Sequence, residues 1–475
     1  MKRGAEMTLM PEDSCQRLLD GCQRIGVVAD TSIADMWEVF AVQSYGAEVE
    51  IEAGKVSLAG GGGEGGFGLR ILNQGKVGFA YAANSDNSQR LVDAALSAAS
   101  LVPSVEGFEF PDDEGETKIS PMWDAEVDNV SPEQLMLQAD SMLSTCKDFN
   151  PIAVITGGGI SASCTAGALL TSQGISTSGM HSSHGGGIQV TIDEDDKLTS
   201  GWSSMQSFEL LDDLSPICDE AVKLAEITRN TITDNEGARE APVMFTHSGI
   251  RSLFSNVFAS SLRGEKMARG ESVWSGKISE SVFDSHLSIH DDGTIEGGAG
   301  SGRRDGEGRK TQRTTLIERG VLKSGIWSTR DAAEQISEGN IEYARSTGNA
   351  GRGGHQSSPY TSISNFILSS SQGSNSRDSV IEEMEDGWVV HSVMGAHTAN
   401  PSSGDFSVTS SSILKVVNGE ITGALKQAGV SGNLPKAFSE GVSLIEMDKP
   451  RSIWASGSVV IPDILLRNGI RINPS

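Results

Sequence analysis

Apolar and polar residues alternate with a period of two in the first part of the chain, and this feature constrains the fold most. In Ala47–Glu52 every apolar residue is followed by a glutamate, as expected of a strand with one buried face. The residues Asn73–Lys76 join two further apolar runs, Leu69–Leu72 and Val77–Tyr81. They read Asn-Gln-Gly-Lys and are of the types that form tight turns. Residues 36–81 are therefore predicted to form antiparallel hairpins.

Four segments before residue 230 carry apolar residues at spacings of three and four, which is the pattern of an amphipathic helix. They are residues 14–26, a segment that follows Ser88, a segment that follows Ser131 and Pro132, and residues 215–229. Strands are expected again over 152–210. Within them, the acidic run Asp193–Asp196 is expected to be a solvated hairpin tip and not a metal site.

Residues 233–242 combine turn-forming and charged residues with almost no apolar content. Such a segment is typical of a linker, and we place a domain boundary there. The predicted domains are residues 1–238 and 239–475. The first is expected to hold an antiparallel sheet with helices.

The sequence beyond this boundary is predicted to be mostly β. A short strand at 243–245 precedes one long helix, whose apolar stripe runs from Ile250 to Leu262 and indicates a buried face. Alternating apolar residues then flank three glycine turns. These turns are at 291–293, 318–320 and 418–420. The two halves together predict an α+β fold of two domains.

The net charge of the chain is strongly negative, with 37 Lys and Arg against 63 Asp and Glu, or −26. The densest basic group, at 303–313, is interleaved with Asp305 and Glu307, so we expect no nucleic-acid partner. The five cysteines form no Cys-x-x-Cys pair, which is typical of a reducing compartment. No stretch approaches 18 consecutive apolar residues. We therefore predict a cytoplasmic protein with no membrane partner.

Two familiar chemical motifs can be tested and set aside. The glycine-rich run Gly60–Gly68 lacks the Gly-Lys-Ser/Thr ending of a phosphate-binding loop and is followed by a strand pattern, so a flexible hairpin connection is expected there. No Gly-x-Ser-x-Gly nucleophile elbow occurs, which argues against a serine hydrolase.

Three pairs of histidines have spacings that invite a metal site. His181 and His184 lie in a run of Ser and Gly, where a loop could bring them together. His286 and His290 lie in a segment that alternates like a strand, where four residues span about 13 Å, so they could not share one ion. His391 and His397 flank a hairpin-like segment. For each pair, a surface or hydrogen-bonded histidine is the ordinary interpretation.

Several longer motifs resemble the TldD/PmbA family, whose members are also described as modulators of DNA gyrase. They are GFGLRILNQGKVGFAYAAN at 66–84, VWSGKISE at 273–280, HDDGT at 290–294, DGEGRKTQRTTLIERGVLK at 305–323, RSTGNAGR at 345–352, GAHTANPSSGDFSVTSSSILKVVNGEI at 395–421 and SGNL at 431–434. Their order and spacing cover nearly the whole chain. The resemblance implies an open, barrel-like sheet in the C-terminal domain.

The resemblance also implies a function divided between two related subunits, which associate as a zinc-dependent peptidase acting on unfolded peptides. The catalytic TldD-type subunit carries HExxxH on the first helix of its C-terminal domain, and a cysteine near its C-terminus is the third zinc ligand. The matching residues here are His247, Ser248 and Ser252, and no cysteine follows Cys218. The chain therefore resembles the PmbA (TldE) type. No metal is expected in it, and zinc is expected in the partner subunit.

A zinc-free subunit could still bind an extended peptide through main-chain hydrogen bonds, which read no sequence. Two segments are candidates, because each combines a glycine that permits close backbone approach with a side chain that can bond peptide amides. They are Ser346, Thr347, Gly348 and Asn349, and Gly404, Asp405 and Phe406. The alternative is that both are turns whose side chains bond their own backbone.

The leading hypothesis is thus a non-catalytic subunit that packs against a TldD-like, zinc-bearing partner and completes an enclosed peptide channel. One alternative is a stand-alone peptidase that binds zinc through an unrecognised set such as His181, His184 and a distant carboxylate. Another is a regulatory binding protein, such as a gyrase modulator. A homodimer of the isolated chain also remains open.

Overall fold

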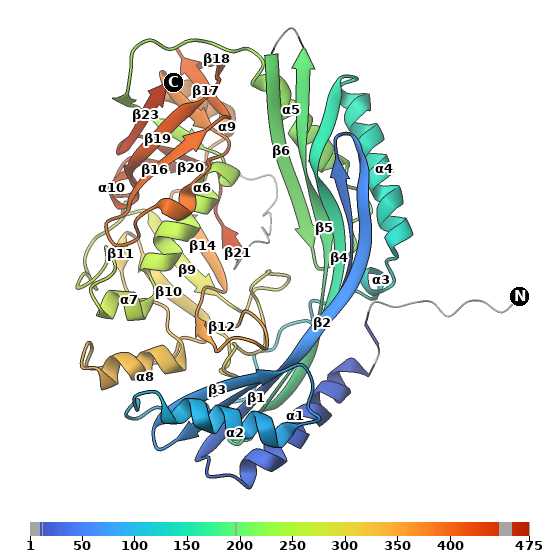
Figure 1. The fold of residues 1–475 in the computed structure, drawn as a ribbon. Coiled ribbons are helices and arrows are strands. Elements are labelled where there is room, and N and C mark those ends of the chain that lie inside the picture. The colour runs from blue at the N-terminus through green and yellow to red at the C-terminus, as the bar shows by residue number, and fades with distance from the viewer. Residues whose placement is uncertain (1–9, 12, 195–196, 446–457, 475) are drawn as a thin grey trace, which may run out of the picture.

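The computed structural model of the 475-residue chain describes residues 10–11, 13–194, 197–445 and 458–474. The predicted α+β fold is confirmed, and the chain forms a long curled sheet beside a more compact β-rich region (Figure 1). Within the described residues, no helix is both long and apolar enough to span a membrane.

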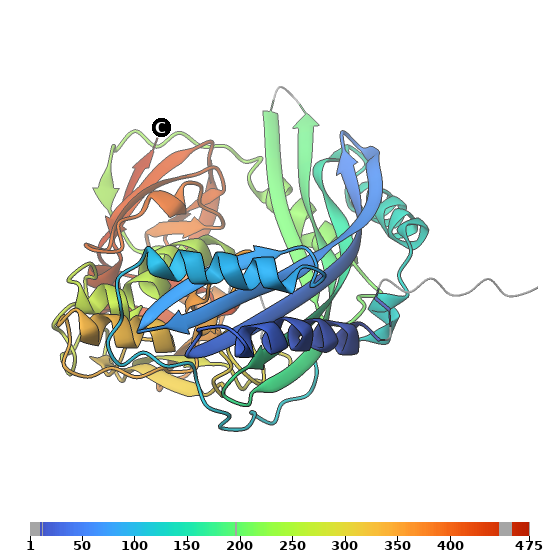
Figure 2. The same cartoon turned by 60° about the horizontal axis from the view of Figure 1, so that its bottom comes forward.

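Six long strands form the N-terminal sheet, and neighbouring strands are antiparallel throughout. They are β1 (Met36–Glu52), β2 (Lys55–Asn73), β3 (Lys76–Ala82), β4 (Ala153–Thr171), β5 (Ser176–Glu194) and β6 (Lys197–Ser207), in the order β3-β2-β1-β4-β5-β6. The predicted turn between β2 and β3 is confirmed, with positive φ angles at Gln74 and Gly75. The sheet curls into a half-barrel (Figures 1 and 2).

The expected flexible connection at Gly60–Gly68 is wrong, because these residues lie inside β2 and pair with β1. The connection between the two strands is at Ala53 and Gly54. A Cβ at Gly61 would lie only 2.8 Å from the carbonyl oxygen of Gly46, and one at Gly65 2.5 Å from that of Val42. Close approach of the neighbouring strand, and not flexibility, accounts for these two glycines.

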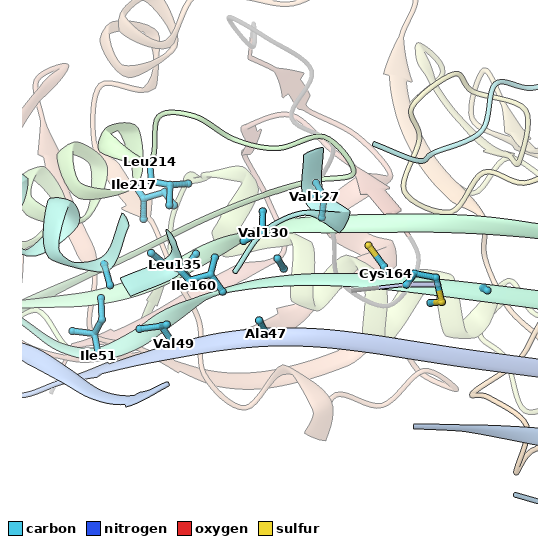
Figure 3. Packing of buried hydrophobic residues seen from close by; sticks show 14 of the residues in the cluster. Ala47, Val49, Ile51, Val127, Val130, Leu135, Ile160, Cys164, Leu214 and Ile217 are labelled. Atoms are coloured by element: carbon cyan, nitrogen blue, oxygen red, sulfur yellow. The ribbon is translucent and has the colours of Figure 1, made fainter. Parts of the chain in front are cut away.

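Five helices pack with this sheet, and the four predicted ones are confirmed. They are α1 (Ser14–Asp30), α2 (Ser88–Ser100), α3 (Ala125–Asp128), α4 (Pro132–Phe149) and α5 (Ser215–Ile227). Ser131 and Gln134 begin α4 with a reciprocal capping box, which fixes the start of the helix. The apolar residues of β1, β4 and β5 face these helices and form the first core (Figure 3).

The predicted acidic tip falls between β5 and β6. Asp193 and Glu194 pair with Leu198 and Lys197 at the end of the ladder. Residues 195–196 lie outside the described residues, as do residues 1–9.

The C-terminal half is mostly β, as predicted, and its strands are divided over four sheets. The first is β11 (Val321–Leu322), β10 (Arg313–Glu318), β9 (Leu287–Asp292), β14 (Asn365–Ser370) and β21 (Ser458–Val460); the second is β12 (Ala350–Gly351) and β13 (Tyr360–Thr361); the third is β18 (Glu420–Leu425), β17 (Ile413–Val417), β15 (Gly387–Val390), β8 (Val243–Phe245), β22 (Ile464–Leu466) and β20 (Val442–Leu444); the fourth is β16 (Asp405–Ser410), β19 (Ala428–Asn433), β23 (Ile470–Pro474) and β7 (Arg239–Glu240).

The predicted long helix after β8 begins at His247 and is formed by two pieces. These are α6 (His247–Phe254) and a π-helical turn, η1 (Ser255–Ala259), and the shorter helices that follow are α7 (Gly264–Ala268), α8 (Thr329–Ser337), α9 (Arg377–Met384), η2 (Ala396–Thr398) and α10 (Leu434–Phe438). Phe254 and Phe258 pack edge-to-face, with ring centroids 5.0 Å apart, and both contact Phe438. The apolar stripe therefore forms the centre of the second core.

Two of the three predicted glycine hairpins are confirmed. Positive φ angles at Arg319 and Gly320 turn β10 into β11, and those at Asn418 and Gly419 turn β17 into β18. The third turn, at 291–293, is not tight: β9 ends there and pairs antiparallel with the next strand, β10, only after a long connection. The twenty residues up to β10 form loops that contact the N-terminal sheet.

The concave face of the N-terminal sheet lies toward the C-terminal half (Figures 1 and 2). Strands β1–β6 all belong to this one sheet, and the described strands from Arg239 onward belong to the other four. The boundary at 238/239 itself stays a prediction. The site described next lies where the two halves meet.

Candidate functional site: the junction of the two domains

Four buried charged residues join the two halves, and we call them the inter-domain ion cluster: Glu38, Arg70, Glu307 and Arg352. Arg70 of β2 donates to both carboxylate oxygens of Glu38 on the neighbouring β1, at 2.9 and 2.5 Å. Its third nitrogen donates to Oε1 of Glu307 at 3.1 Å. Arg352, from the far side of the junction, also donates to Glu38. Two cations and two anions are thus paired within one cluster.

The side chains of the inter-domain ion cluster are almost inaccessible, with exposed fractions of 0–4%. Burial alone would raise the pKa of Glu38, but the charges of Arg352 and Arg70 and their hydrogen bonds outweigh it and hold that pKa below its usual range. The two guanidinium groups also lie over aromatic rings, those of Phe110 and Phe40, at 4.9 and 4.8 Å. These ion pairs and ring contacts therefore fix the junction.

Next to this cluster is a cavity of about 540 Å³, which we call the inter-domain pocket. Three parts of the chain line it. They are residues of strands β1, β4 and β5 (Phe40, Gly167, Leu169, Thr177, Gly179 and His181, with Ala168, Ser178 and Met180), the segment 119–123 and the loop 301–306. This volume is in the usual range for small-ligand sites.

The charged residues of the pocket wall already have partners. Arg303 lies 3.8 Å from Glu116, and Arg304 donates to Asp113 at 2.6 Å and to the carbonyl oxygen of Gly308 at 2.9 Å. Burial lowers the pKa of His181, so its ring is uncharged at neutral pH. The two arginines of the wall thus lie against neighbouring carboxylates.

Asp305 belongs to the same loop and accepts three backbone hydrogen bonds, from Glu307, Arg309 and Ala350, at 2.9–3.1 Å. Burial, together with the charge of Glu307, raises its pKa to about 7. Its carboxyl group organises the loop that separates the pocket from the inter-domain ion cluster.

A smaller cavity of about 160 Å³ shares the loop 301–306 as a wall. Its lining is mostly small residues: Gly300, Ser301, Gly302, Gly306, Gly348, Ala350, Gly351, Ser362 and Ser364, with Arg304, Asp305, Thr311, Asn349 and Ile363. Such residues leave backbone groups close to the cavity surface. Two of the predicted peptide-binding residues, Gly348 and Asn349, are among them.

The side chains of the segment Ser346–Asn349 bond one another and their surroundings. Thr347 donates to Oδ1 of Asn349 at 2.7 Å and accepts from the backbone of Trp327 at 2.8 Å. Asn349 donates to Asp291 at 2.5 Å, and the backbone of Gly348 donates to the hydroxyl of Ser346 at 3.2 Å. Self-bonding was the alternative interpretation of this segment, and it describes two of these four contacts, those between Thr347 and Asn349 and between Gly348 and Ser346. Peptide binding there stays a prediction.

The second predicted segment lies elsewhere and lines neither cavity. Gly404 has a φ of +80°, Asp405 accepts from Nδ2 of Asn433 at 2.9 Å, and Phe406 is buried in the second core. The hydrogen bond from Asn433 holds the pKa of Asp405 below its usual value. The structure does not bring the two predicted segments together in one cavity.

The start of α6 carries the residues that match the HExxxH position. Nδ1 of His247 lies 3.5 Å from Asp463, and its Nε2 is 3.1 Å from the hydroxyl of Ser248. The hydroxyl of Ser252 and Nε2 of His391 are buried and have no hydrogen-bond partner among the described residues. Burial lowers the pKa of His391 to about 4.

No loop brings His181 and His184 together, because both lie in β5, within the region where strands are expected, and, three residues apart in a strand, they face opposite sides of the sheet. His184 bonds Gln138 at 3.0 Å and accepts from the backbone of Leu211 at 3.1 Å. His286 and His290 also bond different partners. Across the described part of the chain, no three or more His, Cys, Asp or Glu residues are placed to hold a metal ion.

Comparison with protein-family models places this junction in context. A model of the PmbA/TldA metallopeptidase C-terminal domain matches residues 238–472, and a model of PmbA/TldA metallopeptidase domain 1 matches residues 37–100. The chain belongs to the TldD/PmbA family. Both models overlap the inter-domain ion cluster, since Glu38 and Arg70 fall in one and Glu307 and Arg352 in the other.

Three known proteins illustrate the relationship. An uncharacterised protein of Methanocaldococcus jannaschii is 27% identical over 91% of this chain and 95% of its own length. A metalloprotease of the same organism is 30% identical, over 35% of this chain and 34% of its own length. The crystal structure of TldE from Thermococcus kodakarensis superimposes with a TM-score of 0.84 at 20% identity, covering 95% of this chain and all of that one. The fold of this TldD/PmbA protein is thus that of TldE.

The residues of α6 do not fit the zinc site that the family resemblance implies for catalytic members. Zinc needs three protein ligands and a base that activates water. His247 can be a ligand, but hydroxyl groups occupy the positions of the glutamate and the second histidine, at Ser248 and Ser252.

Sequence reasoning missed the inter-domain ion cluster, although a signal was present. Arg70, Glu307 and Arg352 lie within three of the motifs that carry the TldD/PmbA resemblance, at 66–84, 305–323 and 345–352. Arg70 stands in the otherwise apolar and glycine-rich run 66–72, and such a charged residue is a candidate for a buried ion pair. The motifs that hold Glu307 and Arg352 are polar and carry no such signal. For the glycines of the inter-domain pocket the sequence carries no comparable signal.

Proposed function

We propose that this chain is the non-catalytic, TldE-like subunit of a heteromeric metallopeptidase whose zinc is held by a TldD-like partner. The observation that carries this proposal is the start of α6, where Ser248 and Ser252 stand at the positions that a glutamate base and a zinc ligand would require. Without them the helix offers neither a base nor a second imidazole. Family membership and the TldE-like fold support the same conclusion.

In such a complex, this subunit would contribute to peptide binding and to the walls of an enclosed channel. Main-chain recognition suits varied unfolded peptides, because every peptide presents the same amide groups. Gly348 and Asn349 line the smaller cavity at the domain junction, which supports the first predicted segment as a peptide contact. The second segment, Gly404–Phe406, remains a separate candidate.

The test is affinity purification of the full chain from its native cell, followed by mass spectrometry and metal analysis. We expect a homologue that carries HExxxH to co-purify, and zinc to be present in proportion to that homologue. Peptidase activity should require both chains. It should disappear when the glutamate of the partner's motif is replaced by glutamine, because the base that activates water is then lost. The complex itself should stay intact in this variant.

Two outcomes would contradict the proposal. Stoichiometric zinc and peptidase activity in the isolated chain would favour a stand-alone enzyme. Co-purification with DNA gyrase, without a homologue that carries HExxxH, would favour a regulatory binding protein. If the isolated protein forms an inactive homodimer, this agrees with the proposal, provided that the added homologue displaces one of the two copies.

A further inference from the structure

The floor of the inter-domain pocket is open because two glycines face each other across β4 and β5. Gly167 pairs with Gly179, on the face of the sheet that also presents Phe40 and Leu169 to the pocket. A Cβ built on Gly179 meets no heavy atom within 4 Å, and one on Gly167 meets only a backbone oxygen at 3.8 Å. Neither residue has a positive φ. The backbone therefore does not require glycine at either position.

These two glycines differ from others in the same sheet. At Gly61, a Cβ would lie 2.8 Å from a neighbouring carbonyl oxygen, so contact between strands requires glycine there. At Gly167 and Gly179 the space that a side chain would fill is part of the pocket. The glycine pair thus creates a depth in the pocket that larger residues would remove.

The walls above this floor are apolar and deformable. Met122 lines them, together with Trp123 and Phe40. Methionine side chains are unbranched and polarisable, and they adapt to apolar groups of different shape. Because Arg304 is bonded to Asp113 and Gly308, Arg303 lies beside Glu116 and Asp305 already accepts three backbone hydrogen bonds, an ionised ligand group would lose its hydration and would have to compete for each of these partners.

We propose that the inter-domain pocket binds an uncharged, apolar side chain of an extended peptide, with Gly167 and Gly179 as its floor. This inference rests on the proposed function for the choice of a peptide as the ligand. The smaller cavity behind the loop 301–306 is lined by small residues, so peptide amide groups next to the bound side chain find backbone partners nearby. The pocket thereby makes this subunit selective for large apolar residues in the substrate.

The experiment measures binding of capped pentapeptides, acetyl-Gly-Gly-X-Gly-Gly-amide, to the isolated full chain by titration calorimetry. With X as Leu or Phe we expect binding, and with X as Asp or Lys at least tenfold weaker binding. Gly179→Leu should fill the floor and lower the affinity for the Leu and Phe peptides at least tenfold. Gly62→Leu is the matched control, since a Cβ there also meets nothing within 4 Å and Gly62 lines neither cavity.

Circular dichroism and thermal unfolding establish that the variants fold, and Gly167→Val replaces Gly179→Leu if that variant does not. The proposal is overturned if no pentapeptide binds, if Asp or Lys binds as tightly as Leu, or if the floor variant binds like the control. Toluene binding as tightly as the Phe peptide would also overturn it, because the cavity would then recognise a small apolar molecule and not a peptide. These measurements need no partner chain, so their failure is distinct from failure of the proposed heteromer.

Discussion

Glu38 and Asp291 are both fully buried carboxyl groups, one on β1 of the N-terminal sheet and the other on β9 of the C-terminal half, yet their surroundings favour opposite ionisation states. Glu38 is held between two guanidinium groups, which keep its pKa below the usual value. Asp291 accepts hydrogen bonds from Asn349 and the backbone of Ser364 but has no cation beside it, and burial raises its pKa to about 7. Hydrogen bonds from neutral donors do not replace a charged partner at these sites.

The difference assigns different tasks to the two carboxyl groups. The charge of Glu38 is needed to neutralise two arginines, so it belongs to the joining of the domains. Asp291 supports the Asn349 side chain beside the smaller cavity and can do so with or without its proton. The predictions below test this contrast.

The largest expected effect is that of Arg70→Met, which removes one cation and leaves Glu38 and Glu307 buried with fewer partners. We expect a loss of about 3–5 kcal/mol in the free energy of unfolding, as is typical when one member of a buried ion pair is removed. Denaturation by urea measures it. The control Lys223→Met removes an exposed pair with Asp219 and should change stability by less than about 0.5 kcal/mol. Equal effects in the two variants would show that the cluster does not hold the domains together.

The second expected effect is a change in the pH dependence of stability in Asp291→Asn. Because the pKa is raised to about 7 in the folded state, the folded protein binds more protons than the unfolded chain between pH 4 and 7. Ionisation of Asp291 therefore lowers the free energy of unfolding as the pH rises through this range. Between pH 4 and pH 8, the free energy of unfolding of the variant should rise by roughly 2–4 kcal/mol relative to that of the wild type, at about 1.4 kcal/mol for each unit by which the pKa is shifted. Parallel pH profiles would contradict this assignment.

The smallest effect on stability is expected for Asp405→Ala, which removes an exposed carboxylate bonded to Asn433. Its loss should lower the free energy of unfolding by about 1 kcal/mol or less. If the segment Gly404–Phe406 contacts peptide, the KM of the reconstituted pair should rise roughly three- to tenfold, the value of one hydrogen bond. Unchanged peptide affinity and turnover would remove this segment as a candidate.

Local patterns predicted the elements of this fold well because their causes are local. The alternation at Ala47–Glu52 reports one buried face, and the turn at Asn73–Lys76 needs residues that accept positive φ. The start of α4 follows from a capping box between residues three positions apart. In each case the residues that decide the structure are neighbours in sequence.

Predictions failed where the deciding partner is distant. The run Gly60–Gly68 has the composition of a flexible loop, but its pairing with β1 makes it a strand. At 291–293 the chain does not turn back at once, because the connection from β9 to the next strand, β10, first reaches the N-terminal sheet, where Glu307 meets Arg70. The candidate site shows the same limit: the motifs contained Arg70, Glu307 and Arg352, but nothing local indicated that they meet.

The separations within the inter-domain ion cluster also determine the order in which it can form during synthesis. Glu38 and Arg70 are 32 positions apart on adjacent strands, whereas Glu307 is 237 positions from Arg70 and Arg352 is 314 positions from Glu38. On the ribosome, the first pair is complete long before its later partners emerge. Glu38 and Arg70 are therefore synthesised together on one hairpin, and the cluster gains its remaining members only when the second half of the chain docks on that hairpin.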